Sequence, residues 1–143
     1  MSSAKEDVES LMNEYVAFAE QLLAKYGEFA PYGAAMKPDG ETVSVSGFDE
    51  DQKTVPANII ELLTDAFTTA AHSRTYRATA MFYNATVELP DSGEPQNVIA
   101  CALDHEDNFS VIVLLPYELT EGDVVFGEPI AQEGESQIFG RVH

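Results

Sequence analysis

The side chains best suited to binding a metal ion lie in one short stretch, Asp104-His105-Glu106-Asp107-Asn108. Carboxylate and amide oxygens in a turn are ligands for hard cations, and a histidine could add a nitrogen. The stretch lacks the glycine and the spacing of an EF-hand loop, and acidic residues are also common in solvated turns. Two interpretations follow: an ordinary exposed turn, or a metal site formed by Asp104, His105, Glu106 and Asn108.

Residues for nucleophilic catalysis are not placed together along the chain. Cys101 is the single cysteine, so no intrachain disulfide is expected, and its position in an apolar strand pattern is typical of a buried residue. His105 follows Cys101 by four residues, too far for direct contact along an extended strand. No serine-hydrolase, zinc-protease, P-loop or dinucleotide-binding motif is present. We therefore expect no catalytic residues and no cofactor, although absent motifs do not exclude an enzyme.

Two further groups have both a structural and a functional interpretation. Arg74 and Arg77 could grip an anionic ligand, or they could pair with a helix end and with neighbouring acids. Tyr26, Phe29 and Tyr32 surround Pro31, and such a cluster could bind a peptide or form a core corner between a helix and a sheet.

The stretch from Gln96 to Leu119 predicts two strands joined by an acidic turn. With a loop of Glu106, Asp107 and Asn108, His105 faces Phe109 and the strands acquire one continuous apolar face. The opposite face is apolar too, with Val98, Ala100 and Ala102 on one strand and Ile112 and Leu114 on the next.

A strand that faced water on one side would alternate apolar and polar residues. These two strands do not, so we expect them to be covered on both faces, by helices or by a second copy of the protein. On this basis we predict a homodimer in which Ala100, Ala102, Ile112 and Leu114 lie at the interface or under a helix.

The overall charge limits the classes of partner. The chain has 143 residues with 25 acidic and 7 basic side chains, a formal net charge of −18. Such a chain repels nucleic acids and anionic membranes, so neither is expected as a partner. A basic protein partner fits this charge, and so does a well-solvated acidic surface without a specific partner.

Hydrophobic periodicity predicts the other elements of a single domain spanning residues 1–143. Residues 3–26 and a segment from Pro56 to about 72–74 have helical spacing, and residues 29–37 and 41–47 read as a hairpin around Pro38-Asp39-Gly40. A long strand is expected over 76–89, and short strands over 124–126 and 137–139. The fold class is therefore α+β: an antiparallel sheet of about five to six strands with two main helices packed on it, in the order helix, hairpin, helix, meander.

One segment resembles a known group. Gly27-Glu28-Phe29-Ala30-Pro31-Tyr32-Gly33-Ala34, followed by Asp39-Gly40 and later Pro116-Tyr117, is similar to a group of small bacterial proteins of unknown function in which a helix precedes a G-x-F-x-P-Y-G-A stretch. The resemblance implies no activity.

These observations favour a non-catalytic, cytoplasmic protein–protein interaction module that self-associates. The acidic, polar start MSSAKEDVES does not resemble a secretory signal, and no apolar run is long enough to span a membrane. Two alternatives remain: an acidic inhibitor or immunity-type protein that binds a basic partner, and a small-molecule sensor or enzyme with a pocket between helices and sheet.

Overall fold

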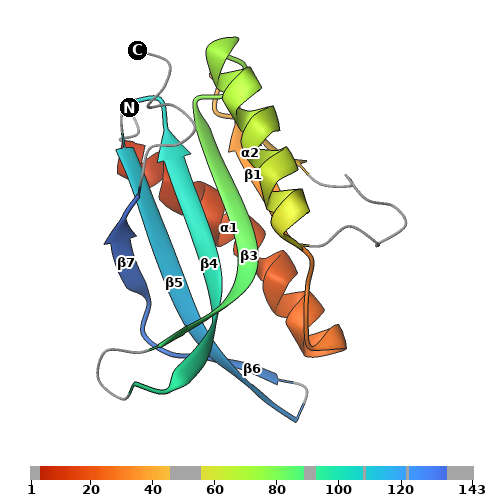
Figure 1. The fold of residues 1–143 in the computed structure, drawn as a ribbon. Helices are drawn as coiled ribbons and strands as arrows, with labels where there is room; N and C mark the ends of the chain where they lie inside the picture. The colour runs from red at the N-terminus through yellow and green to blue at the C-terminus, as the bar shows by residue number, and fades with distance from the viewer. Residues whose placement is uncertain (1–3, 46–55, 89–92, 108, 122, 135–143) are drawn as a thin grey trace.

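A computed structural model describes residues 4–45, 56–88, 93–107, 109–121 and 123–134 (Figure 1). Over these residues the structure has two helices and seven strands in the order α1 (Ala4–Tyr26), β1 (Tyr32–Met36), β2 (Thr42–Val45), α2 (Pro56–His72), β3 (Ala78–Glu88), β4 (Pro95–His105), β5 (Phe109–Thr120), β6 (Asp123–Phe126) and β7 (Ile130–Glu133). Asn108 of the predicted central turn and the expected strand at 137–139 lie outside these ranges.

All seven strands belong to one antiparallel sheet with the order β2-β1-β3-β4-β5-β6, and β7 also pairs with β5. The α+β class with an antiparallel sheet is therefore confirmed. The expected five to six strands were too few, and the predicted element order is not matched, because the chain returns from β6 to β5. The reason is an open edge: β6 pairs only with Tyr117–Thr120, so β7 is added along Val111–Leu114.

The central hairpin has the predicted register. His105 is opposite Phe109, Leu103 opposite Val111, and Ile99 opposite Leu115. A slip of one residue would exchange the two faces of each strand, so two differently covered faces fix this register.

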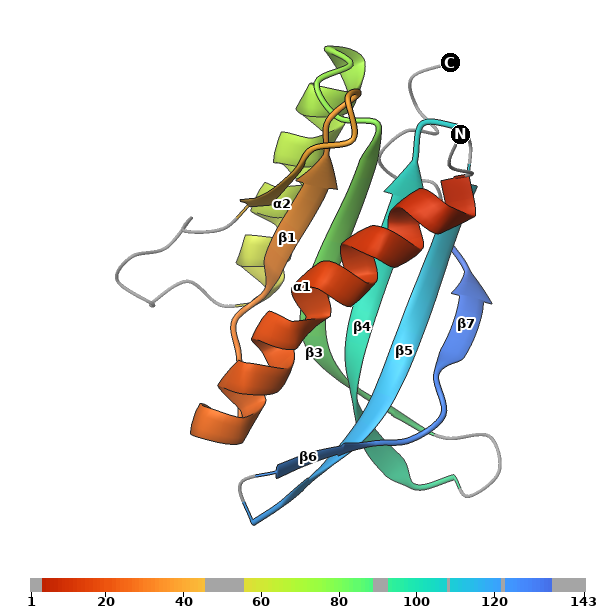
Figure 2. The same ribbon diagram turned by 180° about the vertical axis from the view of Figure 1, so that it is seen from behind.

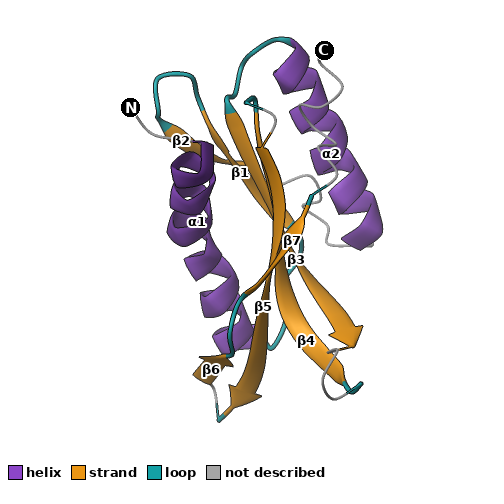
Figure 3. Cartoon of the chain, turned by 90° about the vertical axis from the view of Figure 1, so that its left-hand side faces the viewer, coloured by secondary structure: helices purple, strands orange, loops and turns teal. Residues whose placement is uncertain are grey.

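The two helices cover opposite faces of the sheet, as Figure 3 shows. The first core cluster joins α1 to β1, β3, β4 and β5, and includes Leu11, Leu23, Phe82, Ile99 and Leu103. The first helix, α1, ends at Tyr26, as expected. The next residue, Gly27, adopts a φ of +79° and donates its N–H to the Leu23 carbonyl at 2.8 Å.

The second helix covers only part of the other face. The cluster beneath α2 contains Ile59, Leu63 and Phe67 of the helix, with Ala35 of β1 and Met81 of β3. In Figure 1, α2 runs along β1 and β3, while β4, β5 and β7 have no helix in front of them.

Neither α1 nor α2 combines the length and apolar character that a membrane-spanning helix needs.

Candidate interaction surface

Three of the proposed metal ligands, Asp104, His105 and Glu106, lie in the described ranges, and they do not point to a common site. Successive residues of a strand point to opposite faces of the sheet. His105 therefore lies on the face covered by α1, where it contacts Asp7, and Asp104 lies on the other face, between its strand partners Thr79 and Ser110. Glu106 is exposed in the turn. Within the described ranges no three acidic, histidine or cysteine side chains are grouped as metal ligands would be.

His105 instead belongs to a buried charged cluster that sequence spacing did not predict. Its Nε2 lies 2.8 Å from Oδ2 of Asp7, a residue 98 positions away at the start of α1. Its Nδ1 accepts the backbone N–H of Asp107 at 3.1 Å. With a carboxylate as its partner, Nε2 carries a proton and donates it to Asp7.

Arg77 completes this cluster rather than forming an anion site with Arg74. Its Nη2 donates to Oδ1 of Asp7 at 3.0 Å, and its Nη1 to the Pro38 carbonyl at 3.1 Å. Arg74 is exposed in the turn after α2 with a φ of 55°. The two terminal nitrogens of Arg77 thus hold α1 and the β1–β2 turn against the sheet.

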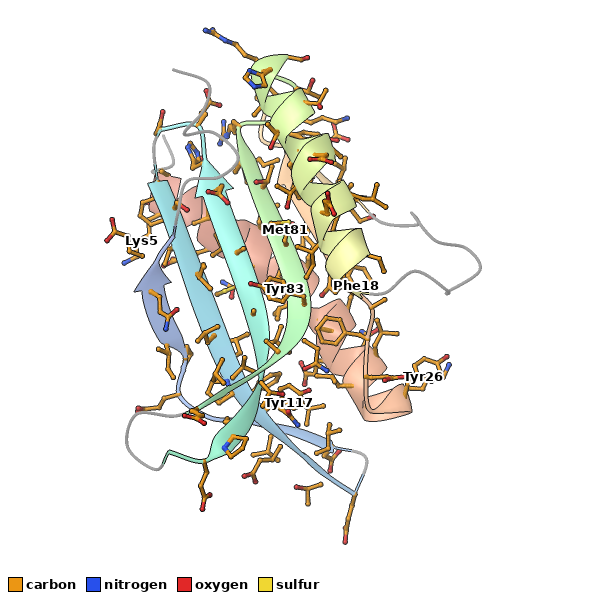
Figure 4. The ribbon with its side chains drawn as sticks, in the orientation of Figure 1. Lys5, Phe18, Tyr26, Met81, Tyr83 and Tyr117 are labelled. Carbon is orange, nitrogen blue, oxygen red and sulfur yellow. The ribbon has the colours of Figure 1, made fainter. Side chains whose placement is uncertain are left out.

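The aromatic group is divided between the core and the surface. Phe29 and Tyr32 are both 8% exposed in the cluster beneath α1, and the Tyr32 hydroxyl donates to the Tyr15 carbonyl at 2.6 Å. Tyr26 is 62% exposed at the end of α1 (Figure 4). Phe29 and Tyr32 therefore form a core corner, which leaves only Tyr26 accessible to a partner.

Cys101 is fully buried on the α1 face of β4. Burial raises the pKa of its thiol to about 12, because the thiolate would have to leave water. At neutral pH it is a protonated thiol within the core, as its place in the sequence predicted.

One part of the sheet has an apolar surface that no described helix covers. We call it the open face; it consists of three buried residues and five partly buried ones, Val98, Ala100 and Leu114 with Tyr83, Ala85, Val87, Ile112 and Ile130. Strand pairing brings them together, since Ala100 is opposite both Tyr83 and Leu114, and Leu114 is opposite Ile130. Figure 4 shows Met81 and Tyr83 in succession along β3; Met81 packs with α2, whereas Tyr83 belongs to the open face.

The open face contains three of the four strand residues predicted for an interface. Ala100, Ile112 and Leu114 belong to it, whereas Ala102 packs at the margin of the α2 cluster. Val98 and Ala100 are 0% and 1% exposed without a helix above them, because larger neighbours on adjacent strands enclose them. Sequence reasoning missed Tyr83 and Ile130, although the apolar alternation of β3 was a usable signal for the first.

Two surface hollows lie where β4 and β5 separate, rather than between a helix and the sheet. The larger, of about 590 Å³, is lined by Gln96, Tyr117 and Leu119 among others, and the smaller measures about 200 Å³. Neither contains an arginine or histidine in its lining. A small-molecule site of the expected kind therefore gains no support from them.

No family model, no curated protein and no solved structure matches the chain.

Proposed function

We propose that this protein is a non-catalytic interaction module that forms a homodimer through the open face. The observation that carries the proposal is the apolar surface of Tyr83, Ala85, Val87, Ile112 and Ile130 around a buried centre. Contiguous apolar surface of this kind is typical of interaction sites. Two-fold symmetry would place the same patch on both partners, so an apolar face needs no complementary charges.

Charge favours a second copy as the occupant of this face. None of the eight side chains is charged, although the chain carries a net charge of −18. Two such chains repel each other over most of their surfaces, and an uncharged face is where they can approach with the smallest electrostatic cost. A basic partner would gain nothing from this face and would be drawn to acidic surface instead.

The buried cysteine fits a protein of the reducing cytoplasm, where thiols stay unpaired. We place the protein there, with self-association as its primary activity.

Sedimentation velocity of the full chain at micromolar concentration tests the proposal. We expect a dimer, and Ile112→Glu should convert it to a monomer, because a carboxylate would be buried in the apolar interface. Ile130→Glu gives a second test at the margin of the face. Leu62→Glu is the matched control, since Leu62 is an exposed apolar residue on α2, outside the open face.

A monomer for the parent chain would overturn the proposal, and so would dimers of unchanged stability in both open-face variants. A shortened chain that ends at Gly134 tests for a different occupant of the face. If residues 135–143 cover the face, the full chain would be monomeric and the shortened chain would dimerise, which contradicts a second copy as the natural partner.

A further inference from the structure

The sheet splits at one end into two separate ribbons. β4 and β5 pair only as far as Val98 and Pro116. Beyond this point Pro95–Asn97 pair with β3, and Tyr117–Thr120 pair with β6. Figure 2 shows the β3–β4 and β5–β6 ribbons diverging from each other. We call this opening the fork; the residues that line it are Pro95, Gln96, Asn97, Tyr117, Glu118, Leu119 and Thr120.

Side chains brace the fork and leave a hollow within it. The Gln96 amide donates from Nε2 to the Tyr117 carbonyl at 2.9 Å, and the Tyr117 hydroxyl donates to Oδ1 of Asn84 on β3 at 2.8 Å. The hollow between the ribbons has a volume of about 590 Å³. A smaller one of about 200 Å³ shares three of its lining residues and adds the apolar side chains of Pro116, Val125 and Phe126.

The fork presents backbone groups of a kind that pair with a strand. The Pro116 carbonyl points toward the β6 side, because it accepts the Gly127 N–H at 2.8 Å. Backbone groups alternate in direction along a strand, so those of Tyr117 and Leu119 point toward β4. The Tyr117 carbonyl is taken by Gln96. No described strand pairs with Leu119 on that side, because β4 has already turned away.

The strands that form the fork carry charge of one sign only. Residues 78–134, which include β3 to β7, contain no lysine and no arginine. Acidic side chains are exposed on both ribbons near the fork: Glu88 and Glu94 on one, and Glu118, Glu121 and Asp123 on the other. Acids on both sides of the fork reinforce each other's field and attract a cation between the two ribbons.

We propose that the fork binds an extended segment of a basic partner protein, with lysine or arginine side chains next to the acids and an apolar side chain in the smaller hollow. The segment adds a short strand beside Tyr117–Leu119, and its N–H groups compete with Gln96 for the Tyr117 carbonyl. Main-chain hydrogen bonds of this type supply affinity in strand addition, and side-chain sites supply selectivity. Its lysine or arginine side chains distinguish this segment from β3 to β7 of a second copy, which contain neither residue.

Titration of ¹⁵N-labelled protein with a peptide of alternating lysine and valine, about six residues and ~20 Å long when extended, tests this proposal. We expect saturable shifts of the Asn97, Tyr117 and Leu119 amides. The same peptide with every backbone nitrogen methylated keeps its charge but cannot donate to the Tyr117 carbonyl. A peptide of alternating glutamate and valine keeps the backbone but reverses the charge. Neither should bind.

Glu118→Lys should weaken binding by about tenfold, which corresponds to ~1.4 kcal/mol. Glu133→Lys is the matched control: the same charge change on β7, outside the lining of the fork, should weaken binding by less than about twofold, through the overall field alone. Leu119→Pro removes a backbone donor that points into the fork, together with the leucine side chain, and should weaken binding. A melting curve verifies first that this variant folds.

Equal binding of the methylated peptide, or equal effects of the two lysine variants, would reduce the interaction to general attraction and overturn the proposal. So would shifts confined to residues outside the fork. Shifts of the fork amides upon simple dilution, without peptide, would identify a second copy of this chain as the occupant and would also overturn it. Because the peptide is titrated against both the parent and Ile112→Glu, failure here is distinguishable from failure of the homodimer.

Discussion

Asp7 accepts hydrogen bonds from two side chains that reach it from distant parts of the chain, His105 and Arg77. Its side chain is only 5% exposed, so either bond would be costly to lose. Arg77 also joins the strands around it: its N–H donates to the Met36 carbonyl at 2.8 Å, and its carbonyl accepts the Glu106 N–H at 2.9 Å. We interpret this cluster as structural, because Nη1 and Nη2 of Arg77 and Nε2 of His105 all donate to groups within the protein. The Nε of Arg77 is buried and has no hydrogen-bond partner among the described residues.

Asp7→Ala should therefore lower the free energy of unfolding by about 3 kcal/mol, since it leaves a partly buried guanidinium and an imidazole without their acceptor. Glu9→Ala, on the same helix, is the control. It removes only the exposed Lys5–Glu9 pair at 3.9 Å and should lower the free energy of unfolding by less than about 0.5 kcal/mol. Urea denaturation of both variants measures the difference. Similar losses in the two would show that the cluster is not a stabilising element.

Asp104 is a buried carboxyl whose Oδ1 lacks a hydrogen-bond partner. Burial raises its pKa above the usual 3.8, and a hydrogen bond with Ser110 opposes this in part. A raised folded-state pKa means that folding favours the protonated acid. The contribution of Asp104 to stability is therefore lost as the pH rises from the unfolded pKa through the folded one.

Asp104→Asn should consequently stabilise the protein at neutral pH, by on the order of 1 kcal/mol, and should have little effect near pH 3, where the parent residue is already protonated. Thermal melts of the parent and the variant at both pH values check this. Asp65→Asn, at an exposed position of α2, is the control and should show no such pH-dependent difference. Destabilisation by Asp104→Asn at neutral pH would contradict a penalty for the buried charge.

At the scale of elements, Gly33 sets how closely α2 approaches the sheet. A Cβ at this position would lie 2.7 Å from Cζ of Phe67 and 3.1 Å from the Ala80 carbonyl oxygen. The helix can therefore bring Phe67 onto β1 only because residue 33 has no side chain.

Gly33→Ala should destabilise the protein by about 1–3 kcal/mol, because the core around Phe67 would be overpacked. Gly127→Ala is the control: its Cβ would make ordinary contacts of 3.5 Å or more with Pro116. Melting temperatures of the two variants measure the effect. If Gly33→Ala were as stable as Gly127→Ala, α2 would not be held at this distance from β1.

The sequence predicted the elements that have strong local patterns. The central hairpin follows the predicted register because apolar residues on both faces and a short turn leave one good alignment. β7 was not predicted, since Ile130–Glu133 is short, lies between Pro129 and Gly134, and forms because β5 offers an unpaired edge. Local patterns carry no information about such an edge.

The same limit applies to the sites. Apolar residues on both faces of β4 and β5 indicated the open face, because alternation along a strand is a local property. The Asp7–His105 contact joins residues 98 positions apart, and a single sequence contains no signal for it. The acidic turn suggested metal ligands by composition alone, although alternation in the predicted strand already places Asp104 and His105 on opposite faces.

At the scale of the whole molecule, added salt should affect the two proposed interactions in opposite directions. Two acidic chains repel each other, so homodimerisation should strengthen as salt shortens the Debye length from about 10 Å at 0.1 M to about 3 Å at 1 M. Binding of a basic peptide at the fork should weaken over the same range. Dimer dissociation constants and peptide affinities measured at both salt concentrations check this. A dimer that salt dissociates would indicate ion pairs rather than apolar contact.

Light scattering coupled to size-exclusion chromatography tests the central claim most directly. At micromolar concentration the account predicts twice the 15.6 kDa mass of one chain for the parent protein, and a single-chain mass for Ile112→Glu. A single-chain mass for the parent, with Tyr83, Ile112 and Ile130 left facing water, would contradict it.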